Sequence, residues 1–139
     1  MIGLLLVSHG NLCEYMLKST AMIVGNIEQA CAVPLNPGET PQNYENRVRK
    51  AIADLDTGEG IIALVDVLGG TPYNTVGSLS RECKLQIITG MNMPMTVYFT
   101  MERNNGHLVE KLMNSACEAA KSGIKILQPC KNGGNGYNE

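Results

Sequence analysis

Two residues that together could perform nucleophilic chemistry follow apolar segments of this sequence. His9 lies just beyond the apolar residues 4–7, and Asp66 comes directly after the apolar residues 61–65. An imidazole that donates a hydrogen bond to a carboxylate from one ring nitrogen has its other nitrogen unprotonated and nucleophilic. We therefore predict that Asp66 orients His9 and stabilises the positive ring that forms when the free nitrogen attacks an electrophile.

A glycine-rich turn after Asp66 suggests what the electrophile is. Gly69 and Gly70 permit a tight turn whose bare N–H groups bind anions well. Thr71 is expected to cap the next helix, with Pro72 as its first residue, so that a helix N-terminus faces the same place. These loops contain no Lys or Arg. The pattern predicts a phosphotransferase with a phosphohistidine intermediate, in which Gly69, Gly70 and Thr71 bind the phosphoryl oxygens.

The elements that must position these residues alternate between apolar runs and helical periodicity, which is typical of βαβ units and a parallel sheet. The predicted strands span residues 2–7, 28–35, 61–65 and 85–88, and the predicted helices span residues 12–24, 41–55, 72–82, 93–102 and 107–121. A flavodoxin-like strand order of 2-1-3-4 makes the first and third strands neighbours. We expect an α/β three-layer sandwich in which His9 and Asp66 leave the same edge of the sheet.

The C-terminal part of the chain carries weaker signals. Residues 124–127 alternate partially and are predicted to form a short antiparallel edge strand, and the Gly- and Asn-rich residues 131–139 are predicted to be a flexible tail. A length of 139 residues fits one domain. We therefore expect a single domain over residues 1–130.

Composition excludes several classes of protein. The formal net charge of −2 leaves no basic surface for nucleic acid or anionic membranes. The N-terminal apolar run is too short to span a membrane and lacks the preceding positive charges of a signal peptide. The five cysteines form no CxxC pair, so reduced thiols in a cytoplasmic protein are expected. Neither a metal nor an organic cofactor is expected.

Three segments resemble the IIA component (EIIA) of the mannose family of the bacterial phosphoenolpyruvate-dependent sugar phosphotransferase system. They are residues 8–10 (SHG), 66–74 (DVLGGTPYN) and 89–95 (TGMNMPM), and the resemblance extends over residues 1–128. It implies that His9 is the phosphorylated residue, that Asp66 is its hydrogen-bonding partner, and that residues 69–71 lie beside the phosphoryl group.

The resemblance also implies partners for the chain. The carrier protein HPr would donate the phosphoryl group and the IIB component would accept it, so that a sugar is phosphorylated as it crosses the membrane through IIC and IID. Association with the membrane would therefore be indirect. The family is dimeric and exchanges a C-terminal strand, whose position here is residues 124–127. Separately, Met91, Asn92 and Met93 follow the fourth strand and are predicted to form an adaptable partner-binding rim.

Two alternatives stay open at this point, and a third, the receiver module, is excluded. The phosphotransfer subunit that feeds dihydroxyacetone kinase has a similar domain, although residues 66–72 favour the sugar-transport branch. A receiver module phosphorylated on Asp66 would need an acidic pair after the first strand, where this chain has Ser8 and His9. A non-catalytic anion- or nucleotide-binding module would use residues 69–71 and would have no need of His9.

Overall fold

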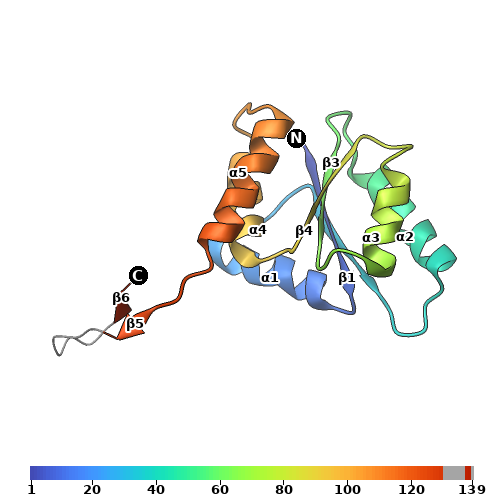
Figure 1. Ribbon diagram of the computed structural model, residues 1–139. Helices are drawn as coiled ribbons and strands as arrows, with labels where there is room; N and C mark the ends of the chain where they lie inside the picture. Colours follow the sequence, from blue (N-terminus) through green and yellow to red (C-terminus); the bar gives the residue numbers. More distant parts are fainter. Residues whose placement is uncertain (130–136, 139) are drawn as a thin grey trace.

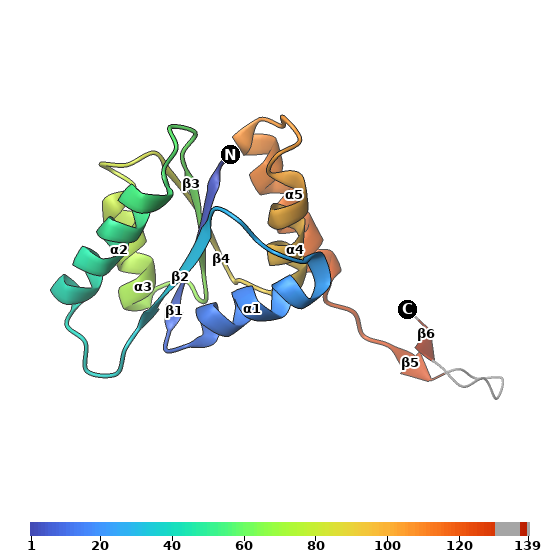
Figure 2. The same ribbon diagram turned by 180° about the vertical axis from the view of Figure 1, so that it is seen from behind.

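The structure, a computed structural model, describes residues 1–129 and 137–138 and contains a three-layer α/β sandwich (Figure 1). A central parallel sheet has the order β2-β1-β3-β4, as predicted. Its strands are β1 (Gly3–His9), β2 (Ala30–Leu35), β3 (Ile61–Val65) and β4 (Leu85–Thr89). The helices α1 (Leu12–Val24), α4 (Met93–Glu102) and α5 (Val109–Ser122) cover one face, and α2 (Pro41–Leu55) and α3 (Gly70–Leu79) cover the other (Figure 2).

Burial on both faces explains the continuous apolar runs of the central strands. Leu4 and Leu6 of β1 pack with Phe99 and Leu112 beneath α1, α4 and α5. The alternate residues of the same strand belong to the cluster on the other face, which α2 and α3 cover. A strand covered on both sides needs apolar residues at every position, so it shows no alternation in the sequence.

The register of β1 and β3 brings the ends of these strands together. Val7 lies beside Val65, and the Asp66 N–H donates to the Val7 carbonyl oxygen at 3.2 Å. On the other side of β1, the Gly10 N–H donates to the Leu35 carbonyl oxygen at 2.8 Å. The segment that follows β1 is therefore anchored to both neighbouring strands.

Most predicted element boundaries agree with the structure to within three residues, and the differences have local causes. Thr40 caps α2 as predicted, because its Oγ1 accepts the Asn43 N–H at 3.1 Å. Strand β2 begins at Ala30 instead of residue 28, since Gln29 has a φ of 51° that is incompatible with a strand. Helix α3 ends at Leu79, whose carbonyl oxygen accepts the N–H groups of two later residues in a closing turn.

The edge strand predicted at residues 124–127 is absent. These residues form no strand, and the short strand β5 (Gln128–Pro129) pairs antiparallel with β6 (Tyr137–Asn138) in a separate two-stranded sheet. This segment extends away from the sandwich after α5 (Figure 1), so the central sheet offers it no pairing partner within one chain. Most of the tail predicted at residues 131–139 lies outside the described residues. No helix in the described part of the chain is long and apolar enough to cross a membrane.

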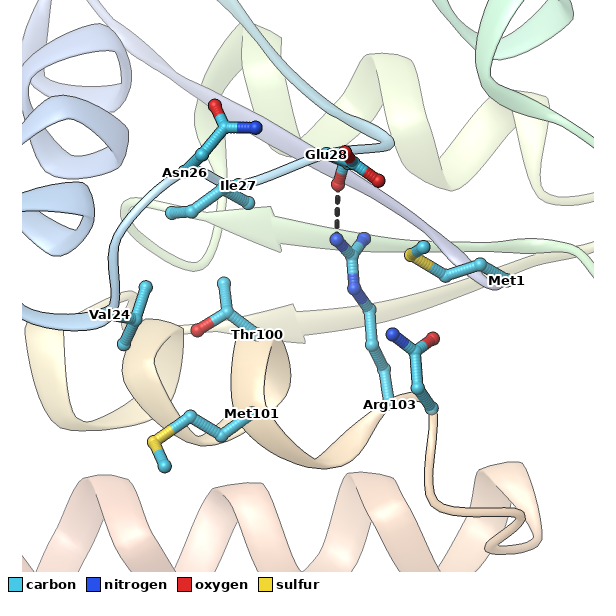
Figure 3. A pocket seen from close by; sticks show the side chains of 9 residues that line it. Met1, Val24, Asn26, Ile27, Glu28, Thr100, Met101 and Arg103 are labelled. Atoms are coloured by element: carbon cyan, nitrogen blue, oxygen red, sulfur yellow. Dashed lines mark hydrogen bonds between the residues drawn. The ribbon is translucent and has the colours of Figure 1, made fainter.

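A buried arginine holds together the edge where the strands begin. Arg103 follows α4 and is 7% exposed. Its Nη1 donates to the carbonyl oxygens of Ile2 at 3.0 Å and Gln29 at 2.8 Å, and its Nη2 donates to that of Glu28 (Figure 3). These bonds join the end of α4 to the segments that enter β1 and β2, at the pole of the sheet opposite His9.

We predict that Arg103→Met lowers the free energy of unfolding by about 2 kcal/mol, because it removes the donors of three carbonyl groups while keeping the aliphatic volume. Urea denaturation measures the change. Arg49→Met is the control: Arg49 is exposed and bonds only Glu82 among the described residues, at 2.7 Å, so its loss should change stability little. Equal stability of the Arg103 variant and the unmodified chain would contradict this role.

Candidate functional site

His9 ends β1 and carries an imidazole that is half exposed, with 51% of the side chain accessible. Its Nδ1 lies 2.8 Å from Oδ2 of Asp66, and the same carboxylate oxygen accepts the His9 backbone N–H at 2.9 Å. An ionised carboxylate only accepts hydrogen bonds, so Nδ1 carries a proton, and in the neutral ring Nε2 then keeps a free lone pair. The arrangement prepares Nε2 as a nucleophile.

Asp66 is held in place by the backbone around it. Its side chain is 8% exposed, and its Oδ1 accepts the Val67 N–H at 2.9 Å. Burial alone would raise the pKa of Asp66, but hydrogen bonds from the His9 amide, the His9 ring and the Val67 amide bring that pKa below its ordinary value of 3.8. Asp66 is therefore ionised at neutral pH and can balance a positive charge on the His9 ring.

Gly70 brings backbone close to the free nitrogen of His9. A Cβ atom on Gly70 would lie 2.9 Å from Cε1 and 3.0 Å from Nε2 of His9, closer than a side chain can approach. Gly70 is the first residue of α3, so its N–H and that of Thr71 have no acceptor within the helix. The positive end of the helix dipole therefore lies beside Nε2, where an anion would be stabilised.

The prediction that Thr71 caps α3 is wrong. The helix begins at Gly70, Gly69 occupies the cap position, and no side chain makes a capping hydrogen bond. Gly69 and Gly70, with φ of 91° and 85°, complete the turn before Thr71 is reached. Thr71 consequently lies in the first turn of α3, and Pro72 is the third helical residue. Thr71 still lies at the helix N-terminus, beside Gly70.

The predicted rim of Met91, Asn92 and Met93 needs correction. Met91 is 7% exposed and belongs to the apolar cluster beneath α1, α4 and α5, because its N–H bonds to the Val65 carbonyl oxygen at 3.0 Å and draws the loop inward. The side-chain amide of Asn92 makes hydrogen bonds within the fold: its Oδ1 caps α4 and its Nδ2 donates to the Ala120 carbonyl oxygen at 3.0 Å. Met93 is half-buried at the start of α4.

Other apolar side chains are exposed in the segments that follow β1 and β3. Val67 and Leu68 are 52% and 74% exposed in the turn that follows Asp66, and Leu12 is 50% exposed at the start of α1. Neither the segment 8–11 nor the segment 66–71 contains Lys or Arg. These two segments therefore supply no cationic side chain to an oxyanion at Nε2, and the backbone N–H groups at the start of α3 are donors for it.

Ser8 is a buried polar residue of the site to which the sequence pattern assigned no role. Its hydroxyl is fully buried and bonds the backbone on both sides of the turn that follows His9. The only signal in the sequence is a hydroxyl residue inside an otherwise apolar strand.

Sequence comparison relates the chain to sugar phosphotransferase proteins. The sequence model of the family described as PTS system fructose IIA component (EIIA-man) matches residues 3–117. The mannose-specific EIIAB component of Escherichia coli (strain K12) is 30% identical over 128 residues, which cover 91% of this chain and 40% of that protein. The fructose-specific EIIA component of Bacillus subtilis (strain 168) is 29% identical over 115 residues, covering 82% of this chain and 79% of that one. The chain thus spans well under half the length of the mannose-specific relative.

Structure comparison agrees. The crystal structure of phosphotransferase system component EIIA from Streptococcus agalactiae superposes with a TM-score of 0.83 at 26% identity, covering 91% of this chain and 97% of that chain. The mannose/sorbose specific IIA subunit from Enterococcus faecalis shares the fold, with a TM-score of 0.81 at 22% identity over 94% of this chain and 97% of that chain.

We predict that Gly70→Ala disturbs His9, whereas Gly69→Ala does not. Both residues have positive φ, so either alanine should cost about 1–3 kcal/mol of stability through backbone strain. Only at Gly70 would the new methyl group meet the imidazole, since a Cβ on Gly69 has nothing within 4 Å. Imidazole resonances of His9 in ¹H–¹⁵N spectra should move in the Gly70 variant alone. If the His9 resonances move equally in the two variants, or in neither, the close approach of Gly70 to the His9 ring is contradicted.

The lowered pKa of Asp66 predicts how stability depends on pH. A carboxyl group whose pKa is lower in the folded state than in the unfolded state stabilises the folded state. This contribution is complete above the unfolded pKa and is lost as pH falls through the folded pKa. The stability difference between the unmodified chain and Asp66→Asn should therefore shrink as pH falls below about 5, where the carboxyl group takes up its proton. Denaturant titrations at several pH values between about 5 and 2 measure it. A difference that stays constant or grows over this acidic range would contradict the assignment.

Proposed function

The chain belongs to the EIIA-man family, the IIA components of the phosphotransferase system, and we propose that His9 is the residue on which it carries the phosphoryl group. The hydrogen bond of 2.8 Å between His9 Nδ1 and Asp66 supports this proposal most directly, because it leaves Nε2 unprotonated beside the start of α3. The alternative of a binding module gives no reason for this arrangement.

The geometry supports a direct transfer between nitrogen atoms. The lone pair of Nε2 attacks the phosphorus of a phosphohistidine on the donor protein, and the donor's N–P bond breaks with its electrons returning to the donor imidazole. The proton on Nδ1 stays in place, so the His9 ring gains a positive charge that the Asp66 carboxylate balances. Transfer to an acceptor histidine is the same step in reverse.

The phosphoryl group is bound by backbone. The N–H groups of Gly70 and Thr71, together with the dipole of α3, face the phosphoryl oxygens. Because the adjacent loops supply no cation, the group is stabilised without being held strongly, which suits a carrier that must release it to the next protein.

IIA components of this system exchange phosphoryl groups with other proteins. For this chain we propose HPr as donor and a IIB component as acceptor, with uptake of a sugar through separate IIC and IID components. The relative from Escherichia coli that combines EIIA and EIIB in its name supports a IIB acceptor. The four described cysteines are free thiols, which supports function in the reducing cytoplasm.

We further propose that the chain forms a homodimer through the segment after α5. Ile124, Ile126 and Leu127 are 74%, 87% and 46% exposed in one chain, and this segment extends away from the sandwich (Figure 1). Packing against a second copy would remove these apolar side chains from water.

We predict that phosphorylated HPr labels the unmodified chain with an acid-labile, base-stable phosphate and that His9→Ala abolishes the label. The only other histidine provides the matched control: His107→Ala should accept the label fully, because His107 lies in the connection between α4 and α5, away from Asp66. Label retained by folded His9→Ala, or an acid-stable, base-labile label typical of an acyl phosphate on Asp66, would contradict the proposal.

A further inference from the structure

We propose that Ser8 is a positioning residue for phosphoryl transfer at His9, an inference that rests on the proposed function. Its hydroxyl donates a hydrogen bond to the Gly10 carbonyl oxygen at 2.8 Å and accepts one from the Cys13 N–H at 2.9 Å. Both the donor and the acceptor capacity of the group are thus used within the turn that carries His9, and the side chain is fully buried.

Ser8 does the work of a helix cap for α1. Asn11 occupies the cap position but makes no side-chain hydrogen bond, so the N–H of Cys13, the second residue of the helix, depends on Ser8 instead. The hydroxyl therefore joins the last part of β1 to the first turn of α1 across residues 9–12.

His9 is consequently restrained from two sides. Asp66 holds its backbone N–H and its Nδ1. Ser8, the preceding residue, holds the carbonyl group of the following residue, Gly10. These restraints together set where the imidazole lies relative to Gly70. Its Cε1 and Nε2 atoms lie so close to Gly70 that a side chain at this position would collide with them.

Ser8 acts through the backbone and not on the phosphoryl group. Side chains alternate along a strand, so Ser8 shares the face of Leu4 and Leu6 beneath α1, while His9 shares the face of Leu5 and Val7 toward α3. Without the hydroxyl, the Gly10 carbonyl and the Cys13 N–H lose a partner and the turn relaxes. A nucleophile displaced by a fraction of an ångström then attacks more slowly, even when its partner protein binds normally.

The test compares Ser8→Ala and Ser8→Thr with Thr20→Val in the full chain. Thr20 is the matched control: it is also fully buried, and it lies on α1, the helix whose second N–H Ser8 accepts, but its hydroxyl bonds only the Met16 carbonyl oxygen, at 2.8 Å, among the described residues. The readouts are kcat and KM for the turnover of phosphorylated HPr while each variant passes its phosphoryl group on to a IIB component, together with the melting temperature of each variant.

We expect Ser8→Ala to lower kcat roughly tenfold with KM unchanged. Ser8→Thr, which keeps the hydroxyl, should recover most of the rate. Thr20→Val should lower the melting temperature but leave kcat unchanged. If Ser8→Ala does not fold, Ser8→Cys, with its weak donor and acceptor, takes its place under the same criteria.

Three results would overturn the inference: a normal kcat in Ser8→Ala, a Ser8→Thr variant as slow as Ser8→Ala, or an equal fall of kcat in Thr20→Val. These results concern Ser8 alone as long as His9→Ala remains unlabelled. Label retained by His9→Ala would instead refute the proposed function itself.

Discussion

The hydrogen bond between His9 Nδ1 and Asp66 Oδ2 is the interaction on which the rest of the site depends. It requires β1 and β3 to be neighbours in parallel register, because only then do the residues that follow Val7 and Val65 meet at one edge. It determines which ring nitrogen carries the proton, and it helps to keep the pKa of Asp66 low despite burial. Tautomer, charge balance and orientation of the nucleophile all follow from this contact.

Much of this arrangement was predictable because buried parallel strands leave a strong signal. The continuous apolar runs indicated β1 and β3, and the strand order then placed His9 and Asp66 together. The start of α3 was mispredicted, since residue preference pointed to Thr71 whereas the turn geometry of Gly69 and Gly70 decides where the helix begins. The segment 124–127 has a strand-like pattern, but within one chain it finds no strand to pair with.

Two further differences come from contacts that a linear pattern does not contain. The sequence pattern predicts that Met91 lies at the surface, yet its N–H bonds to the Val65 carbonyl oxygen and its side chain lies in the core. Ser8 looks like part of a strand, and its two hydrogen bonds become visible only when α1 folds back over it. Both cases depend on how the loops return to the sheet, which local sequence does not specify.

Identifying the atom of His9 that bears the phosphoryl group is the most direct test of the proposed mechanism. In the phosphorylated, ¹⁵N-labelled protein, phosphorus should show one-bond scalar coupling to Nε2 of His9, while Nδ1 remains protonated and bonded to Asp66. Coupling to Nδ1, or phosphate on a carboxylate oxygen, would contradict the assignment of Nε2 as the nucleophile and of Asp66 as the group that orients it.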